Sequence, residues 1–431
     1  MKSLIPLILF LFASFSAQSE KPNIVIIFTD DQGYADLGCY GSKTNRTPRL
    51  DQLAREGTLF TSFYTQTVCG PSRSALLTGR YPCRSKGWGM PAEEITFAEL
   101  IREAGYQTAC IGKWDVSNRK AIIERMPNAQ GFDYFFGALG ANDGGTVKFH
   151  ENNRAAGSSN DMGGLTTLYT DKSIDFLKNK RDPKKPFVLY LAHTMMHTII
   201  DASDRFRGKS EGGLYGDVVE EFDYETGRLL DLLDELKLSE NTLVIYTADN
   251  GPWNQDKYTL KKKGHPEGSV FWGDAGPLRN GKGSPYEGGY RLPCIVRWPG
   301  KVPAGRSSDA VFATIDFLPT LARLCGFEVP TDRRIDGIDQ TDLLMGKTET
   351  GRKTFYFDRA GIRSGKWKYL RAKAHFYGYA REDDRPEAEE LYNLKKDIGE
   401  RENLAEKHPE ILAKLRKLTK EMPQDGPGGI H

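Results

Sequence analysis

The sequence has no excess of charge of either sign. Its 60 Lys and Arg residues stand against 58 Asp and Glu residues, which leaves a formal net charge of +2. A protein that binds nucleic acid through a broad basic face needs more positive charge, so we exclude a nucleic-acid partner. Hydrophobic residues make up 39% and charged residues 27% of the chain, which is ordinary for a globular protein.

The sequence also lacks a hydrophobic run long enough to cross a membrane. The longest run, Leu4–Ala13, follows Lys2 and is too short for a bilayer, which needs about 20 apolar residues. Small residues from Ala17 to Ser19 fit the site where a signal peptidase cuts. We therefore predict a signal peptide over residues 1–19, export to the periplasm or the extracellular space, and no membrane attachment afterwards.

Cysteine is scarce, and its spacing forms no known framework. The six cysteines include no C-x-x-C pair, which argues against a zinc site made of thiolates. Their spacing also shows no disulfide framework. The 45 Gly and 22 Pro residues follow no period, which excludes collagen-like and solenoid folds.

Continuous apolar runs are present, and they have the length of buried strands: residues 23–28, 186–192 and 242–246. Helical patterns lie between these runs, at residues 48–56, 97–104 and 219–236. Alternating strands and helices predict an α/β fold whose large, mostly parallel sheet has helices on both faces.

The pattern changes after about Gly346. Short strand-like runs follow, with a hairpin turn predicted at Ser364-Gly365, and Pro409 then opens an amphipathic helix. We predict a catalytic domain over residues 20–345. Residues 346–431 should form a small α+β subdomain with a short antiparallel sheet.

Polar side chains follow two of the predicted strands. Asp30 and Asp31 come after the first strand, and Asp249 and Asn250 come after residues 242–246. Sites in open α/β sheets form at the carboxyl ends of strands, so these side chains should converge. Their oxygen atoms suit Ca²⁺ or Mg²⁺ better than zinc. Either pair alone is equally well explained as a helix cap or an Asx turn, but together they favour a metal site.

The segment from Thr67 to Arg80 places Cys69 before a Gly-Pro break and Arg73 four residues later. A helix beginning at Pro71 would aim its amide groups at the Cys69 side chain, and Arg73 would lie alongside. This setting should stabilise an anion, and a thiolate nucleophile is conceivable. A thiolate is a poor partner for a hard cation, so an oxygen-bearing group at position 69 fits the metal better.

These segments resemble the type I, formylglycine-dependent sulfatases of the alkaline-phosphatase-like superfamily. The run C-G-P-S-R-x-x-L-L-T-G-R, which begins at Cys69, matches the maturation motif of that family. Further matches are K-P-N-I-V-I-I-F-T-D-D-Q-G from Lys21, G-K-W from Gly112, T-A-D-N-G from Thr247 and G-K-G-S-P-Y-E-G-G-Y-R from Gly281.

The resemblance implies that a formylglycine-generating enzyme converts Cys69 to an aldehyde, which becomes a hydrate. One hydroxyl of the hydrate attacks the sulfur of an O-sulfate ester and the alcohol leaves; the second hydroxyl then expels sulfate. The resemblance also implies that the hydrate binds Ca²⁺, with Mg²⁺ the less favoured ion, together with the four polar residues at the strand ends. Arg73 would hold the hydrate oxygen and the metal carboxylates.

The family pattern assigns three further residues to the sulfate group. Lys113 and Lys282 would neutralise the sulfate oxygens, which gain charge in the transition state. His197, in the stretch L-A-H-T-M-M-H-T, would protonate the leaving oxygen, and His193 in the same stretch is its competitor. Either histidine alone is equally well explained as a loop residue with a satisfied hydrogen bond.

One position departs from the family pattern. After G-K-W the family usually has a histidine that contacts the hydrate, whereas this chain has Asp115. A carboxylate can accept a proton, but it adds negative charge beside an anionic substrate, which Lys113 partly offsets. Either Asp115 is the base, or another residue takes that task, or the enzyme is impaired.

Substrate contacts must come from residues outside these motifs. The candidates are aromatic and polar residues in Gly-rich stretches, each of which is individually more often structural: Trp88, Asn142, Asp143, His150, His193, Trp253, His265, Trp272 and Asp274. Together with export, they predict a carbohydrate sulfate ester, such as an oligosaccharide from a sulfated polysaccharide. The alternatives are a phosphomonoester or phosphonate hydrolase of the same superfamily and a catalytically silent binder of sulfated glycans.

Overall fold

The computed structural model describes residues 21–253, 272–375, 377–378 and 385–421. The predicted signal peptide and His265 lie outside these residues. No helix in the described ranges has the length and apolar character needed to cross a membrane.

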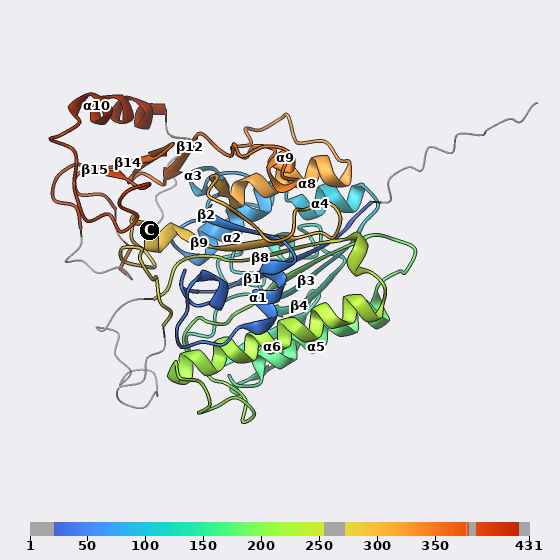
Figure 1. The fold of residues 1–431 in the computed structure, drawn as a ribbon. Coiled ribbons are helices and arrows are strands. Elements are labelled where there is room, and N and C mark those ends of the chain that lie inside the picture. Colours follow the sequence, from blue (N-terminus) through green and yellow to red (C-terminus); the bar gives the residue numbers. More distant parts are fainter. Residues whose placement is uncertain (1–20, 254–271, 376, 379–384, 422–431) are drawn as a thin grey trace, which may run out of the picture.

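An eleven-stranded sheet forms the centre of the molecule (Figure 1), in the order β10-β2-β9-β8-β1-β7-β3-β4-β5-β6, with β11 also paired to β2. The strands are β1 (Asn23–Thr29), β2 (Thr58–Tyr64), β3 (Gln107–Lys113), β4 (Tyr134–Ala138), β5 (Val147–Glu151), β6 (Arg154–Ser159), β7 (Phe187–Ala192), β8 (Thr242–Ala248), β9 (Arg291–Arg297), β10 (Arg306–Ser308) and β11 (Phe312–Ala313). The central strands from β8 through β4 pair in parallel, whereas β9, β5 and β6 join antiparallel. The prediction of a mostly parallel sheet is confirmed.

The three apolar runs of the sequence are the three adjacent strands β8, β1 and β7 at the middle of this sheet. Every residue of β1, β7 and β8 is buried. A strand covered on both faces needs apolar side chains on both sides, which is why these strands read as continuous hydrophobic runs.

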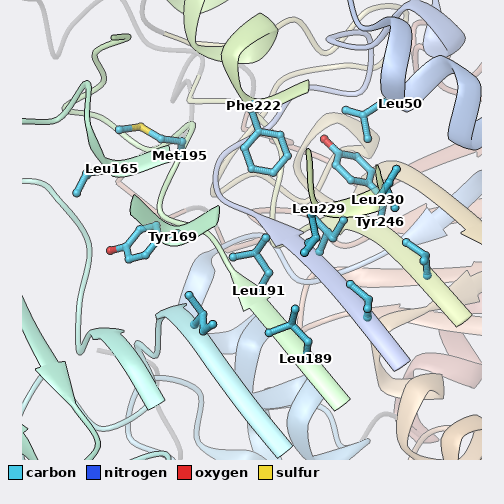
Figure 2. Close-up of a cluster of buried hydrophobic side chains, with 14 of the residues drawn as sticks. Leu50, Leu165, Tyr169, Leu189, Leu191, Met195, Phe222, Leu229, Leu230 and Tyr246 are labelled. Atoms are coloured by element: carbon cyan, nitrogen blue, oxygen red, sulfur yellow. The ribbon is translucent and has the colours of Figure 1, made fainter. Parts of the chain in front are cut away.

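Successive side chains of β1 enter two different cores, because strand side chains alternate between the faces of a sheet. Val25 and Ile27 pack with α1 (Pro48–Arg55), α5 (Leu165–Asp175) and α6 (Gly213–Glu235) on one face. Ile24 and Ile26 pack with α2 (Cys69–Thr78), α4 (Phe97–Glu103) and α8 (Phe317–Cys325) on the other. Figure 2 shows the first of these cores, where side chains of β7 and β8 meet Phe222 and Leu229 of α6.

A second, smaller sheet follows in the C-terminal part of the chain (Figure 1). Its four antiparallel strands are β12 (Thr354–Phe357), β13 (Gly361–Ser364), β14 (Trp367–Leu370) and β15 (Glu390–Asn393), and α10 (Pro409–Leu418) packs on it through Leu415. Because Ser364 pairs with Trp367, the hairpin turn is formed by Gly365 and Lys366, one residue later than predicted.

Candidate active site

The polar residues that follow β1 and β8 converge at the carboxyl end of the sheet. The backbone N–H of Asp249 donates to the Thr29 carbonyl over 3.0 Å, which continues the pairing of the two strands. Asp31 then has a φ of 53°, in the left-handed region that turns a chain sharply. This turn lets Asp30 and Asp31 point to the same place, and both are buried.

Asn250 completes a set of oxygen donors. Its Nδ2 donates to Asp31 Oδ1 over 2.7 Å, and its Oδ1 is buried without a hydrogen-bond partner among the described residues. Ligand atoms of Asp30, Asp31, Cys69 and His197 all lie within 4.8 Å of one another. A buried acceptor oxygen beside several carboxylates has a favourable partner if a hard divalent cation binds there, so these residues fit such an ion.

Cys69 lies against this cluster. Its Sγ is 3.4 Å from Asp30 Oδ1 and 3.5 Å from Lys282 Nζ. Helix α2 begins at Cys69 rather than at Pro71, with Val68 as its N-cap, so the predicted start was two residues late. Residue 69 therefore occupies the first turn of the helix.

The surroundings of Cys69 disfavour a thiolate. Burial raises the pKa of the Cys69 thiol well above its usual value, and the carboxylates of Asp249 and Asp30 raise it further. These effects outweigh Lys113 and Lys282, which lower it. Cys69 as encoded is a neutral thiol, which argues against a bare thiolate nucleophile.

Gly70 allows an aromatic ring to lie beside the start of α2. A Cβ at this position would lie only 2.2 Å from Cδ1 of Trp88, so a larger residue would displace the Trp88 ring. Trp88 in turn donates from Nε1 to Asp115 Oδ2 over 3.1 Å. The maturation motif and the Asp115 loop are thus linked through one indole.

Arg73 links the ends of several strands. Its Nη2 donates to Asp249 Oδ2 over 2.9 Å and to Asp30 Oδ2 over 3.3 Å, and its Nη1 donates to the Lys113 carbonyl over 3.0 Å. The side chain is fully buried. A buried guanidinium with these partners fixes the relative positions of three strand ends.

Two buried lysines contact different carboxylates of the cluster. Lys113 Nζ lies 2.5 Å from Asp30 Oδ2, and Lys282 Nζ lies 2.6 Å from Asp31 Oδ1. Burial lowers the pKa of each amine, but nearby carboxylates raise it above the usual value overall. Both amines are therefore ammonium ions. The pKa of Asp30, which burial alone would raise, is held far below its usual range by Lys113 and the neighbouring basic groups.

His197 reaches the site, whereas His193 does not. His197 Nδ1 lies 2.5 Å from the Thr198 carbonyl, so Nδ1 carries a proton, and Nε2 faces Asp31 and Asp143 at 3.7 and 3.6 Å. His193 is enclosed by the rings of Tyr169 and Phe222. Burial lowers the pKa of His193 to about 3, so it is a neutral core residue, which argues against its predicted contact with substrate.

Asp115 is engaged on both of its oxygens. Oδ2 accepts from Trp88 and lies 3.5 Å from Lys113 Nζ, and Oδ1 accepts from Arg119 Nε over 2.8 Å. The carboxylate is fully buried. This environment holds a carboxylate in place, and it leaves neither oxygen without a donor.

Of the other predicted substrate contacts, some lie at the cluster and some lie elsewhere. The Trp253 ring packs against His197 with ring centroids 5.7 Å apart. Asn142 donates to the carbonyls of His197 and Ile199, so it supports the histidine loop. Trp272 and Asp274 line a different cavity of about 360 Å³, which includes none of the strand-end ligands. His150 lies on β5, next to the edge strand β6.

Arg119, which the sequence did not single out, donates to both Asp115 and Asp143 over 2.8 Å. A basic residue four positions after an unexpected acid is a visible signal. It is nevertheless common on protein surfaces, and only the turned backbone of residues 115–119 brings Arg119 back to the cluster.

Comparison with known proteins decides the family. The Sulfatase family model matches residues 22–327. The chain belongs to the sulfatase family. A second model, N-sulphoglucosamine sulphohydrolase, C-terminal, matches residues 281–425 of this sulfatase, and the predicted superfamily is confirmed.

Several characterised sulfatases are similar over most of their length. The N-acetylgalactosamine-6-sulfatase of Canis lupus familiaris is 35% identical, over 78% of this chain and 69% of that protein. Arylsulfatase G of Rattus norvegicus is 30% identical, over 96% of this chain and 89% of its own length. The Pseudoalteromonas sp. structure named PsFucS1 sulfatase is 27% identical with a TM-score of 0.79, over 94% and 90% of the two chains. The sulfatase is thus a sulfuric ester hydrolase by family.

Proposed function

We propose that this sulfatase is exported and hydrolyses O-sulfate esters of carbohydrates, with residue 69 as the site of the nucleophile and Ca²⁺ as the metal. The observation that carries the proposal is the position of Cys69. It opens α2 inside the maturation motif and lies against Asp30 and Lys282.

Formylglycine at position 69 would supply a hydrated aldehyde whose hydroxyl attacks sulfur. A bound divalent cation, held by Asp30, Asp31, Asp249 and Asn250, would supply positive charge beside that oxygen. The buried oxygen atoms of these residues suit a hard cation and an oxygen-bearing residue 69. A neutral thiol at this position is a poor ligand for such an ion.

The chain's own residues bind and orient the ester. Lys113 and Lys282 are ammonium ions paired with Asp30 and Asp31, and they can hold sulfate oxygens. His197 faces Asp31 with Nε2 at 3.7 Å, while its Nδ1–H donates to the Thr198 carbonyl. The leaving oxygen can therefore receive the Nε2 proton from the doubly protonated imidazolium form of this residue. Trp253 packs on this imidazole and keeps it in orientation.

The proposal of a carbohydrate ester is supported by relatives of this chain. The dog relative is named for N-acetylgalactosamine-6-sulfate chemistry. A solved structure of Ps i-CgsB, 26% identical with a TM-score of 0.77 over 95% of this chain and 94% of its own, is a complex with a neocarrahexaose. Steryl-sulfatase of Homo sapiens is 32% identical over 81% of this chain and 74% of its own, so the sugar itself must be tested.

The direct experiment is desulfation of a panel of defined sulfated oligosaccharides, read by chromatography, with 4-nitrophenyl sulfate and 4-nitrophenyl phosphate alongside. We expect sulfate release from at least one sugar, and loss of that release in Cys69→Ala. Cys83→Ala is the matched control, because Cys83 is half-buried and outside the cluster, and it should keep its activity.

Two results would replace the proposal. Faster release of phosphate than of sulfate would make the protein a phosphoester hydrolase on the same scaffold. Binding of sulfated sugars with no turnover of any ester, by protein whose residue 69 carries the aldehyde, would make it a glycan-binding relative.

A further inference from the structure

A continuous series of contacts between ionisable side chains extends from the strand-end cluster to the surface. From Asp30 it runs through Lys113 (2.5 Å), Asp115 (3.5 Å), Arg119 (2.8 Å), Asp143 (2.8 Å) and His197 (3.6 Å) to Asp31 (3.7 Å). The members near the strand ends are buried. Only two members of this series reach solvent, Arg119 with 44% of its side chain exposed and Asp143 with 38%.

Arg119 is held rigidly in this exposed position. Its Nε and Nη1 donate to Asp115 and Asp143, and its stem lies on Gly140, where an added Cβ would be 2.9 Å from Arg119 Cδ. The backbone of Asp115, Asn118 and Arg119 has φ values of 57°, 54° and 58°. Three non-glycine residues within five positions adopt this sparsely populated conformation, which is found most often at functional sites.

We propose that Arg119 is a specificity-determining residue of the sulfatase. Its free N–H groups, next to the Asp143 carboxylate, bind hydroxyl groups of the sugar that carries the sulfate. In this view Asp115 is a positioning residue that anchors Arg119. The inference rests on the proposed function and adds that the protein recognises hydroxyl groups of the sugar.

The side chains at the rim offer hydrogen-bond partners that suit hydroxyl groups. Within the described residues, two of the five N–H donors of Arg119 are used by Asp115 and Asp143, so donors remain for a ligand. Asp143 supplies an acceptor beside them. A donor and an acceptor side by side match neighbouring sugar hydroxyls.

The engaged state of Asp115 supports the same assignment. Each of its oxygens already accepts from a donor, so the carboxylate is placed to orient Arg119 and Lys113. A proton acceptor for the reaction would need an oxygen directed at residue 69.

The test compares two substrates in three variants. For Arg119→Ala we expect KM for a monosulfated neutral oligosaccharide to rise at least about tenfold, with a smaller change in kcat. The kcat/KM for 4-nitrophenyl sulfate, which has no sugar hydroxyls, should fall by less than about threefold. Asp115→Ala should repeat this pattern, and Asp115→Asn, which still accepts from Arg119, should recover part of the affinity.

Arg323→Ala is the matched control. Arg323 is 50% exposed and also bridges two carboxylates, those of Asp339 and Asp342, but it lies on α8. It should leave both substrates unaffected. Thermal unfolding of every variant checks that the fold is kept.

The outcomes distinguish a failure of the role of Arg119 from a failure of the proposed function. Equal losses on both substrates in Arg119→Ala, or no loss on either, overturn the role of Arg119. A kcat loss in Asp115→Asn on both substrates overturns the positioning role of Asp115 and makes it a participant in proton transfer. If the unsubstituted protein, with the aldehyde confirmed at residue 69, turns over no sulfate ester, the proposed function fails. Calorimetric measurement of the binding of the same sugar to the Arg119→Ala variant then tests the role of Arg119 independently of turnover.

Discussion

At the scale of single residues, the arrangement of acids and amines accounts for the chemistry of the cluster. Three buried carboxylates meet one guanidinium and two ammonium ions. The amide oxygen of Asn250 has no donor among the described residues. Buried polar atoms of this kind are costly unless they find a partner, and a divalent cation is a partner that satisfies them together.

Removal of the metal should therefore lower stability. Addition of a chelator to the purified sulfatase is expected to lower its unfolding midpoint, because an ion that binds only the folded state adds about 2.7 kcal/mol at 100 times its dissociation constant. Calcium should restore the midpoint, as followed by thermal unfolding. Asn250→Ala should weaken the response to calcium.

Asn241→Ala provides the comparison, since Asn241 precedes the opposite end of the same strand, β8. This variant should respond to calcium as the unsubstituted protein does. Equal calcium responses in both variants would show that Asn250 is not a ligand.

Much of this cluster could be predicted from the sequence, and the reason is geometric. Asp30, Asp31, Asp249 and Asn250 follow apolar strands directly, and parallel strands end at one edge. The sequence could not place His193 in the same way. A histidine at a strand end resembles a substrate contact, and only the packing of Tyr169 and Phe222 around it identifies a core residue. Arg119 depends on backbone turns that no local pattern reveals.

At the scale of elements, helix α1 is capped by a side chain from another helix. The first turn of α1 receives no cap from its own N-cap residue, Thr47. Asp223 of α6 supplies it instead, because its carboxylate accepts from the backbone N–H groups of Arg49 and Leu50 over 3.1 and 2.8 Å. This contact docks α1 on α6.

Substitution of Asp223 should be costly. Asp223→Ala removes both acceptors and should lower the free energy of unfolding by about 1–3 kcal/mol, as measured by denaturant titration. Asp231→Ala, on the same helix with 62% of its side chain exposed, should have a small effect. Equal effects of the two substitutions would contradict the capping role.

The same carboxyl group predicts a pH dependence. Burial raises the pKa of Asp223 to about 7, although its two backbone partners counteract part of the rise. A raised folded-state pKa means that the folded protein holds a proton that the unfolded chain releases. The stability that this group contributes is full below about pH 4 and is lost as the pH rises through 7.

The difference in unfolding midpoint between the unsubstituted protein and Asp223→Asn should therefore narrow as the pH is raised from 5 to 8. A difference that stays constant or widens over this range would refute the protonation of Asp223.

The elements themselves were predictable to unequal degrees. The central strands were predicted because they are buried on both faces, and α6 was predicted from its apolar stripe. The edge strand β6 was missed, since its residues Arg154–Ser159 are mostly exposed and carry little hydrophobic pattern. The start of α2 was misplaced because proline favours the first helical position, whereas here the helix already begins at Cys69.

At the scale of the whole molecule, a buried ion cluster joins the small sheet to the large one. Lys368 of β14 is fully buried, and its Nζ lies 3.0 Å from Glu287 Oε1 and 2.7 Å from Glu400 Oε1. Glu287 also accepts from Tyr64 of β2 over 2.5 Å. The small sheet therefore contacts the segment that carries Lys282 through charged groups that have no access to water.

Lys368→Met should destabilise the whole protein. It removes the cation from the buried Glu400 and leaves Glu287 with Arg291, which costs about 3–5 kcal/mol of unfolding free energy, and calorimetry should show a lower midpoint. Lys366→Met, at the exposed turn of the same hairpin, should unfold almost as the unsubstituted protein does. Equal midpoints for the two variants would show that the cluster does not support the fold.

The most direct measurement relates sulfate release to the chemical state of residue 69. Preparations made with increasing amounts of a formylglycine-generating enzyme would be assayed on one sulfated oligosaccharide, and peptide mass analysis would give the aldehyde fraction in each. The account predicts a turnover that rises in proportion to that fraction and extrapolates to zero for the intact thiol. Full turnover by protein that retains the Cys69 thiol would contradict it.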